Sequence, residues 1–337
     1  MSQHMPQQRI ALTLPAAGGK VRDTIALARW AEERGLDDVW WGDGGAPDAL
    51  TLTAAMADAT STIRIGVAVT PVYSRTPAVL AATAYTIGEL MPGRFVMGLG
   101  SSSQTMMEQW HGVPLDKPVT RVKETALMVR SMLAGEKSNF NGKTLTSNGY
   151  RQMPTTKPVP IYLAALRPNM IEMAAEVGDG VIFNLWPRRA LPKMLAHVKI
   201  GAAKAGKNFA DIEIVNRHMV LVTDDVAAAR DAFRAWFAPY YATPVYNSFL
   251  AWAGYEDAAA AIREGWAAKD RNKTAGALSD ALVDEIAILG SADYCRDKIR
   301  ELGAAGITTH IVAPLSMAGR DNIKATQDAF VADNFKR

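Results

Sequence analysis

Two short segments of small residues are the places where this chain could hold a ligand. The first, Gly98-Leu99-Gly100-Ser101-Ser102-Ser103, leaves an apolar run and offers backbone N–H groups and hydroxyls. The second, Ala164-Ala165-Leu166-Arg167-Pro168, places a guanidinium beside the start of a predicted helix. Turns of this kind can hold an anion or the polar edge of a flat cofactor. Small residues at a strand end are also compatible with simple packing, so both interpretations stay open.

The common signatures of other chemistries are absent. The sequence contains no GxxxxGK(S/T), HExxH, GxSxG or CxxC pattern, and its five histidines lack metal-ligand spacing. We therefore predict no metal site, and we interpret His218 and His310, in or beside strands, as structural. The single cysteine, Cys295, excludes an internal disulfide framework and fits a reducing compartment.

Composition narrows the class of protein further. The chain has 337 residues, 49% of them hydrophobic, and 37 Lys+Arg against 34 Asp+Glu, which leaves a net charge of +3. That excess gives no electrostatic argument for binding nucleic acid or an anionic membrane. No apolar run approaches the roughly 20 residues of a membrane span. We expect a soluble, cytoplasmic protein.

The elements that must position the two segments alternate along the chain. Short β-rich runs are followed by longer stretches with apolar residues at helical spacing, the pattern of βα units. We expect strands at Arg9–Leu14, Asp38–Gly42, Ile63–Val69, Arg94–Gly100, Val159–Ala164, Gly180–Asn184, Ile212–Thr223 and Thr308–Ala313. Eight strands with intervening helices predict a single (β/α)8 TIM barrel over residues 1–337, with ligands at the carboxyl ends of the strands. The alternative, a doubly wound sheet, lacks an early Gly-rich dinucleotide turn.

Two segments depart from this alternation. Residues 138–157 are polar and rich in turn formers, which predicts a small hairpin. Residues 236–281 follow the seventh strand and are rich in Ala, Tyr and Trp. We expect this insertion to be helical and to serve as a contact in a homodimer, as a lid over the barrel mouth, or as both.

Several segments, in order along the chain, resemble one known family. They are WWGD, IRIGVAVTPVYSRTPAVLAATAYTIGELMPGRFVMGLGSSS, EQWHGVPLDKPVTRVKETALMVRSMLAGE, KPVPIYLAALRPNMIEMAAEVGDGVIFN and ILGSADYCRDKIRELGAAGITTHIVAP. Together they resemble the luciferase-like monooxygenase superfamily. Within it they are most similar to the oxidoreductases that use the deazaflavin coenzyme F420 and are related to methylenetetrahydromethanopterin reductase.

The resemblance implies a TIM barrel, usually dimeric, with the cofactor ring at its mouth. It implies a non-prolyl cis peptide at Ala68 and Val69, in a bulge of the third strand that presses on the ring. It places Asp43 near the ring. The remaining cofactor contacts that it implies are Gly100, Ser101 and Ser102 around the ring, and Ala164, Ala165, Leu166, Arg167 and Pro168 at the phosphate end.

The sequence also departs from the family pattern. The histidine that serves as a catalytic group in some members is replaced by Gly44, and this leaves the proton donor open. Our candidates for proton transfer or substrate contact are Asp43, Glu108, His111 and Tyr73.

Three functions follow from this resemblance. The first is an F420-dependent oxidoreductase that moves a hydride between the ring and a small organic substrate. The second is an FMN-dependent monooxygenase that receives reduced flavin from a separate reductase. The third, of another class, is a non-catalytic barrel that binds a cofactor without turnover.

Overall fold

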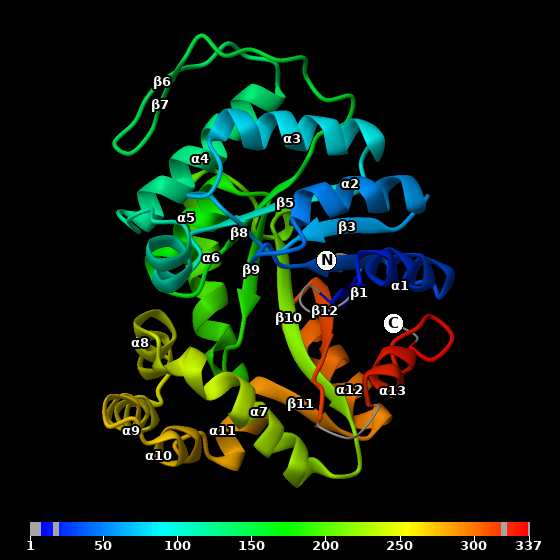
Figure 1. Cartoon of the computed structure of the whole chain (residues 1–337), viewed down its shortest axis with the longest axis vertical. Helices are drawn as coiled ribbons and strands as arrows, with labels where there is room; N and C mark the ends of the chain where they lie inside the picture. Colours follow the sequence, from blue (N-terminus) through cyan, green and yellow to red (C-terminus); the bar gives the residue numbers. More distant parts are fainter. Residues whose placement is uncertain (1–7, 16–19, 318–321, 336–337) are drawn as a thin grey trace.

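Eight parallel strands close into a barrel in the computed structural model, which describes residues 8–15, 20–317 and 322–335 (Figure 1). The ring runs in order through β1 (Arg9–Thr13), β2 (Asp38–Trp41), β3 (Arg64–Val67), β5 (Phe95–Gly100), β8 (Ile161–Ala164), β9 (Gly180–Asn184), β10 (Glu213–Val222) and β12 (Thr309–Pro314). Pairing of β12 with β1, and of β10 with both β9 and β12, closes the ring. The predicted TIM barrel is confirmed.

Helices cover the outside of the barrel. They are α1 (Val21–Glu33), α2 (Ala49–Ala59), α3 (Pro77–Leu90), α4 (Pro118–Leu133), α5 (Pro168–Val177), α6 (Leu191–Lys204), α12 (Ala292–Ala304) and α13 (Asn322–Asp328), with short turns η1 (Thr105–Trp110), η2 (Arg188–Ala190) and η3 (Phe209–Asp211). Several begin at side-chain caps: Asp48 accepts from the Thr51 amide at the start of α2. No helix among these described residues is long and apolar enough to cross a membrane.

The strands bury side chains on both faces. On β1, Ile10 and Leu12 pack outward against the helices, whereas Ala11 belongs to the cluster inside the barrel. In a strand, residues two apart share a face, so each strand contributes alternate residues to the interior. This alternation decides which residues reach the mouth.

An ionic layer closes the amino-terminal end of the barrel interior. The Arg64 guanidinium donates to Asp38 at 2.7 Å and to Glu213 at 2.6 Å, so it links β3 to β2 and to β10 across the barrel. Above this layer the Trp40 ring fills the centre, stacked on Tyr162 with centroids 6.1 Å apart. Only a glycine fits opposite it, because a Cβ at Gly66 would lie 2.3 Å from the Trp40 ring.

Two strand predictions need correction. The expected third strand, 63–69, is broken, because β3 ends at Val67 and a separate short strand, β4 (Thr70–Pro71), follows. An additional parallel strand, β11 (Ala287–Gly290), pairs with the end of β10 at Met219–Val222, beyond the residues that pair with β9. The predicted hairpin is present as β6 (Asn139–Asn141) and β7 (Thr146–Asn148).

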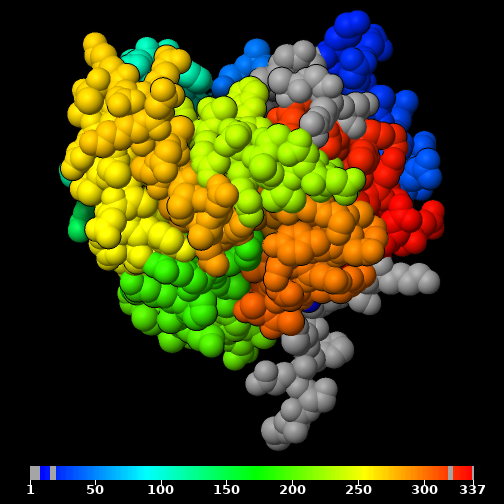
Figure 2. All heavy atoms as spheres, turned by 90° about the horizontal axis from the view of Figure 1, so that it is seen from below, coloured from blue at the N-terminus to red at the C-terminus, as the bar shows by residue number. Residues whose placement is uncertain are grey.

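The segment between β10 and β11 is helical. It contains α7 (Val226–Ala242), α8 (Pro244–Trp252), α9 (Glu256–Ala267), α10 (Arg271–Gly276) and α11 (Asp280–Ile286). These helices have their own apolar cluster, which includes Phe233, Tyr241 and Leu282. Seen from below, α7–α10 form a continuous surface, yellow-green to gold, beside α12 in orange (Figure 2). The hairpin β6–β7 lies at the opposite end of the molecule (Figure 1).

Candidate active site

A bulge interrupts the third barrel strand at the mouth. The peptide bond between Ala68 and Val69 is cis, the conformation that the family resemblance implied. The Ala68 amide donates to the Trp41 carbonyl at 2.7 Å, which ties the bulge to β2. Both side chains are partly buried against the interior cluster above Trp40. The bulge therefore projects into the barrel rather than toward the outer helices.

Small residues on the neighbouring strands make room for this bulge. A Cβ at Gly98 would lie 1.9 Å from the Val67 carbonyl oxygen, and a Cβ at Gly100 would lie 2.6 Å from Val69 Cγ2 and 3.3 Å from Ala164 Cβ. Real Cβ atoms essentially never lie within 3.0 Å of another heavy atom, so a larger residue at Gly98 or Gly100 would displace the bulge. The structure thus brings Val69, Gly100 and Ala164 together in one wall of small residues.

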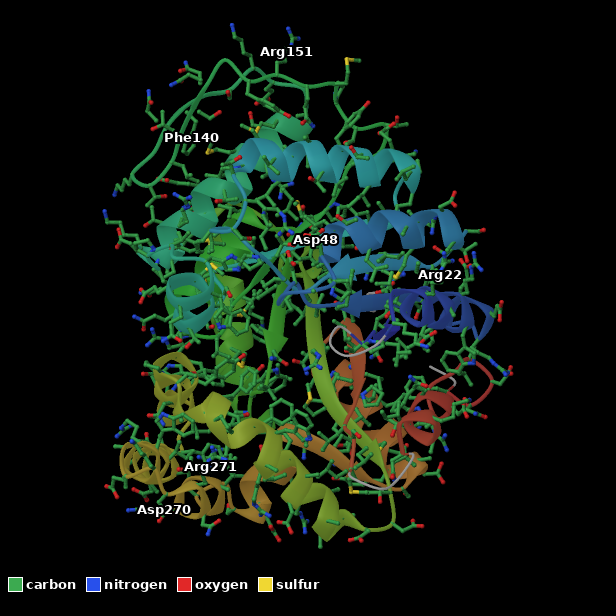
Figure 3. All side chains as sticks on the ribbon, in the orientation of Figure 1. Arg22, Asp48, Phe140, Arg151, Asp270 and Arg271 are labelled. Atoms are coloured by element: carbon green, nitrogen blue, oxygen red, sulfur yellow. The ribbon has the colours of Figure 1, made fainter. Side chains whose placement is uncertain are left out.

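Asp43 lies beside this wall and is held by a paired arginine. A Cβ at the preceding Gly42 would lie 3.6 Å from the Ala68 carbonyl, which places the β2 end next to the bulge. The buried Asp43 carboxylate accepts from Arg75 at 2.5 Å, and Arg75 also bonds Asp48, near the centre of the view in Figure 3. Burial lowers the pKa of Arg75, but the two carboxylates outweigh burial and raise it. Arg75 remains a cation that orients Asp43.

The serine turn after β5 is held open by local contacts. Ser102 adopts a left-handed conformation with φ of 63°, and its hydroxyl contacts the Met106 sulfur at 3.3 Å. Met106 lies in η1, a π-helical turn, and its Cε would be 3.8 Å from a Cβ at Gly44. Ser101 and Ser102 are half-buried. The contact between Met106 and Gly44 places this turn beside the Asp43 loop.

The second small-residue segment ends at a helix amino terminus. Ala164 is half-buried at the end of β8, Ala165 is buried, and Leu166 is half-buried. Arg167 precedes α5, which begins at Pro168, and its exposed side chain forms no hydrogen bond or ion pair among the described residues. The start of α5 carries no side-chain cap. An anion placed there would meet unpaired backbone N–H groups and a guanidinium.

The other proton-transfer candidates lie on η1 and just after β4. Glu108 is exposed on η1, where its carboxylate accepts from Gln104 at 2.8 Å. His111 is exposed at the end of η1. Tyr73 is buried and donates to the Asp116 carbonyl, and burial raises the pKa of its hydroxyl. The hydrogen bonds of Glu108 and Tyr73 hold neighbouring loop residues in place. The roles of these two residues in catalysis stay predictions.

Sequence reasoning missed several polar groups at the mouth. The side-chain oxygens of Thr13, Thr70 and Asn184 are buried without a hydrogen-bond partner. Arg217 follows Glu213 and Val215 on the inward-facing set of β10. The period-two alternation of the strands is the signal that would have found Thr13 and Asn184, once the inward face was known.

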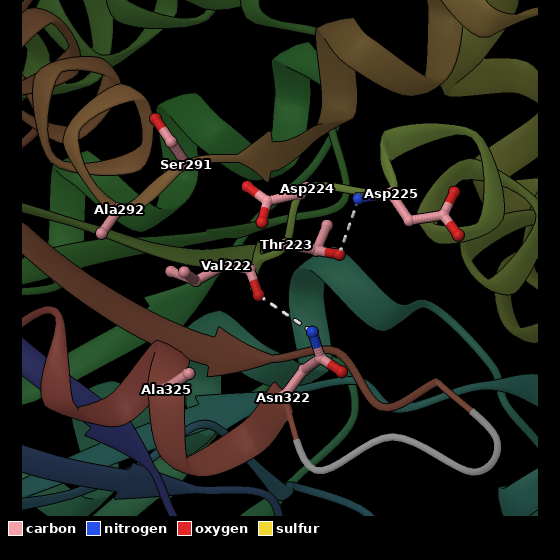
Figure 4. A pocket seen from close by; sticks show the side chains of 8 residues that line it. All are labelled: Val222, Thr223, Asp224, Asp225, Ser291, Ala292, Asn322 and Ala325. Carbon is pink, nitrogen blue, oxygen red and sulfur yellow. Dashed lines mark hydrogen bonds between the residues drawn. The ribbon is translucent and has the colours of Figure 1, made fainter.

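A separate hollow of about 730 Å³ lies at the ends of β10 and β11, beside α12 and α13 (Figure 4). Its lining includes Asp224, Asp225 and Asn322, whose amide donates to the Val222 carbonyl at 3.0 Å. None of the predicted site residues lines it. Two carboxylates also make it unsuited to a phosphate group.

The comparison with known proteins decides the family. The chain matches the model of the luciferase-like monooxygenases over residues 4–309. This chain belongs to that family. It is 30% identical over 302 residues to 5,10-methylenetetrahydromethanopterin reductase of Archaeoglobus fulgidus, a match covering 88% of this chain and 90% of the relative. The enzyme of the same name from Methanolobus tindarius is 30% identical over 284 residues, 83% of this chain and 86% of the relative.

A solved structure agrees with the observed fold of this luciferase-like protein. It is the coenzyme F420-dependent tetrahydromethanopterin reductase of Methanopyrus kandleri, which superposes with a TM-score of 0.82 at 22% identity, covering 98% of this chain and 100% of that one. The likeness to the luciferase-like family and its F420-dependent members, expected from the sequence, is confirmed. The protein is an oxidoreductase of that family.

Proposed function

We propose that this oxidoreductase uses coenzyme F420 and transfers a hydride between the deazaflavin ring and a small organic substrate. The observation that carries the proposal is the inward bulge at Ala68 and Val69, which packs closely on Gly100 at the carboxyl ends of the strands and could support a flat ring. The names of the similar reductases support the choice of cofactor, because the solved relative is described as F420-dependent.

The residues present fit such a group. When bound, the deazaflavin supplies or accepts the hydride. Val69 would support the ring, Asp43 would lie at its edge, and Arg167 with the open start of α5 would hold the phosphate end. Trp40 closes the floor of the mouth and excludes water from below. The chain's task is orientation and exclusion of solvent.

The proton donor, the dimer and the lid also stay proposals. Gly44 supplies no side chain where some family members have histidine. Asp43 is the candidate proton donor that we favour, because the preceding Gly42 lies beside the bulge at Ala68. The helices α7–α10 expose Trp236, Tyr240 and Trp266, with 64%, 49% and 50% of their surface accessible. Exposed aromatic side chains of this size support a homodimer contact or a lid. Light scattering measures the oligomer directly, and a monomer would contradict the dimer.

The test is a titration of the purified apoprotein with F420 and, in parallel, with FMN, followed by cofactor fluorescence. We expect tight F420 binding and weak FMN binding. The variant Gly100→Ala should weaken F420 binding on the order of tenfold, because its Cβ would lie 2.6 Å from Val69 Cγ2. Gly276→Ala is the matched control, since a Cβ there meets nothing within 4 Å.

The other outcomes separate the alternatives. Tighter binding of FMN than of F420 would favour the monooxygenase, for which the family is named, and a partner reductase. Cofactor binding without turnover over a broad panel of electron acceptors would favour the non-catalytic barrel. Binding of neither cofactor would overturn the proposed function.

A further inference from the structure

A positive charge faces the barrel mouth from β10 without a counter-charge. On this strand Glu213 bonds Arg64 inside the barrel, and Val215 belongs to the interior cluster. Arg217 is next in this inward-facing set. Its only side-chain hydrogen bond among the described residues is to the Met219 sulfur at 3.6 Å, and it forms no ion pair with any of them. Burial lowers the pKa of Arg217 to about 10, which leaves the guanidinium charged at neutral pH.

Uncharged polar groups surround this guanidinium. Asn184 on β9 is the register partner of Arg217, and its amide nitrogen donates to the Tyr246 hydroxyl at 3.3 Å. Its amide oxygen is buried without a partner. The phenols of Tyr240 and Tyr246, from α7 and α8, lie close enough to interact electrostatically with Arg217. The Tyr246 hydroxyl, having accepted one bond, still has a proton to donate.

Arg217 lies across the mouth from the bulge. In the ring, β10 is four steps from β3 in either direction, through β5, β8 and β9 or through β2, β1 and β12. The Arg64–Glu213 bond fixes the relative height of these two opposite strands. Ala68 follows Arg64 by four residues, and Arg217 follows Glu213 by four. The bulge and the guanidinium therefore face each other at the same level of the parallel barrel.

We propose that Arg217 and the Tyr246 hydroxyl bind an anionic group of the substrate, a carboxylate or a phosphate. The inference rests on the proposed function, because a ring seated on the bulge leaves this side of the mouth to the substrate. An arginine presents paired N–H donors that match the oxygens of such anions. A partly buried charge without a partner is unfavourable, so an anion that neutralises it binds with a gain in free energy. The substrate class is thus organic acids or phosphate esters.

The test measures binding of small probes to the full-length protein, with and without F420. The probes are succinate, inorganic phosphate and the neutral succinamide. Calorimetry measures how tightly each one binds. The variant Arg217→Met keeps a long apolar side chain beside Met219, and Tyr246→Phe removes only the hydroxyl. Arg22→Met, at an exposed position on α1 far from the mouth, is the matched control for loss of one charge (Figure 3).

We expect wild-type protein to bind succinate or phosphate and not succinamide. The anion that binds more tightly indicates whether the substrate carries a carboxylate or a phosphate. Arg217→Met should weaken that binding by about tenfold or more and Tyr246→Phe by about threefold, while Arg22→Met leaves it unchanged. F420 binding should remain within about twofold in all three variants, since a twofold change is only about 0.4 kcal/mol. Thermal melting checks that each variant is folded.

Three results would overturn the proposal. The first is that wild-type protein binds neither anion. The second is that the Arg217→Met variant binds the anion as tightly as wild type does. The third is a parallel loss of F420 affinity in Arg217→Met, which would assign the guanidinium to the cofactor. A wild-type protein that binds the anions through Arg217 but neither F420 nor FMN would support the anion site and refute the proposed function.

Discussion

Glu213 joins the ionic layer that sets the height of the mouth, and its charge should contribute measurably to stability. Burial raises the pKa of Glu213, but the hydrogen bond and charge of Arg64, with Thr309 and Tyr162, outweigh burial and lower it from 4.5 to about 2. One pKa unit is worth about 1.4 kcal/mol, so the ionised carboxylate stabilises the folded state by about 3 kcal/mol. The side chain is 20% exposed, which leaves little screening by solvent.

The sign of the pH dependence follows from the lowered pKa. This stabilisation is complete above about pH 4.5, where the carboxylate is ionised in both states, and is lost as the pH falls toward 2. The variant Glu213→Gln should therefore unfold about 3 kcal/mol more easily than wild type at pH 7. The difference should shrink below pH 4.5. Urea unfolding at pH 7, 5, 4 and 3, followed by tryptophan fluorescence, measures it.

A control separates this effect from the loss of any ion pair. Glu176 pairs with Lys123 at 2.6 Å on the surface, with 30% and 36% of their side chains exposed. Glu176→Gln should cost less than about 1 kcal/mol, since exposed pairs are weak. If Glu213→Gln lowered stability equally at every pH, packing and not charge would be responsible, and the reasoning would be refuted.

Three further predictions concern single positions. The Gly44→His variant should melt within about 2 °C of wild type, because surface substitutions usually change stability by less than about 0.5 kcal/mol. A Cβ at position 44 would meet only Met106 Cε, at 3.8 Å. A large drop in the melting temperature would show that the loop is packed more tightly than this. Arg167→Gln should weaken F420 binding about tenfold at low salt and less at high salt, measured by fluorescence titration; a salt-independent loss would contradict a charge contact. Burial raises the pKa of Cys295 to about 12, so a thiol reagent at pH 8 should label it only in unfolded protein, and rapid labelling of the folded protein would contradict its burial.

The sequence predicted the barrel because its strands are continuous apolar runs of ordinary length. The β11 strand escaped prediction because it follows a long helical segment and pairs only with the last residues of β10. The break between β3 and β4 also has no signature in residue type, since Ala68 and Val69 suit a regular strand. Only the family resemblance located it. Segments whose shape depends on distant partners are the ones that patterns along the chain describe least well.

The two sides of the mouth differ in how far the sequence could predict them. The small-residue wall is visible because glycines and serines cluster where strands end. Arg217 cannot be recognised in the sequence as an inward-facing residue, because it lies between two other polar residues, Asn216 and His218. Asn216 accepts from Trp186 at 2.6 Å, and His218 stacks on His310 outside the barrel. With polar residues on both faces of β10, no alternation indicates which one points inward.

The arrangement gives a reason for an ionic layer in a barrel that could have been filled with apolar side chains. A buried ion pair is often no more stabilising than well-packed apolar residues, so stability alone does not account for it. The Arg64–Glu213 bond fixes one register between two opposite strands, and apolar packing would fix that register less specifically. Those strands carry the bulge and Arg217, on which the proposed cofactor and substrate contacts depend. A shift of β10 by one residue would turn Arg217 out of the barrel. The layer at the closed end therefore sets the geometry of the open end.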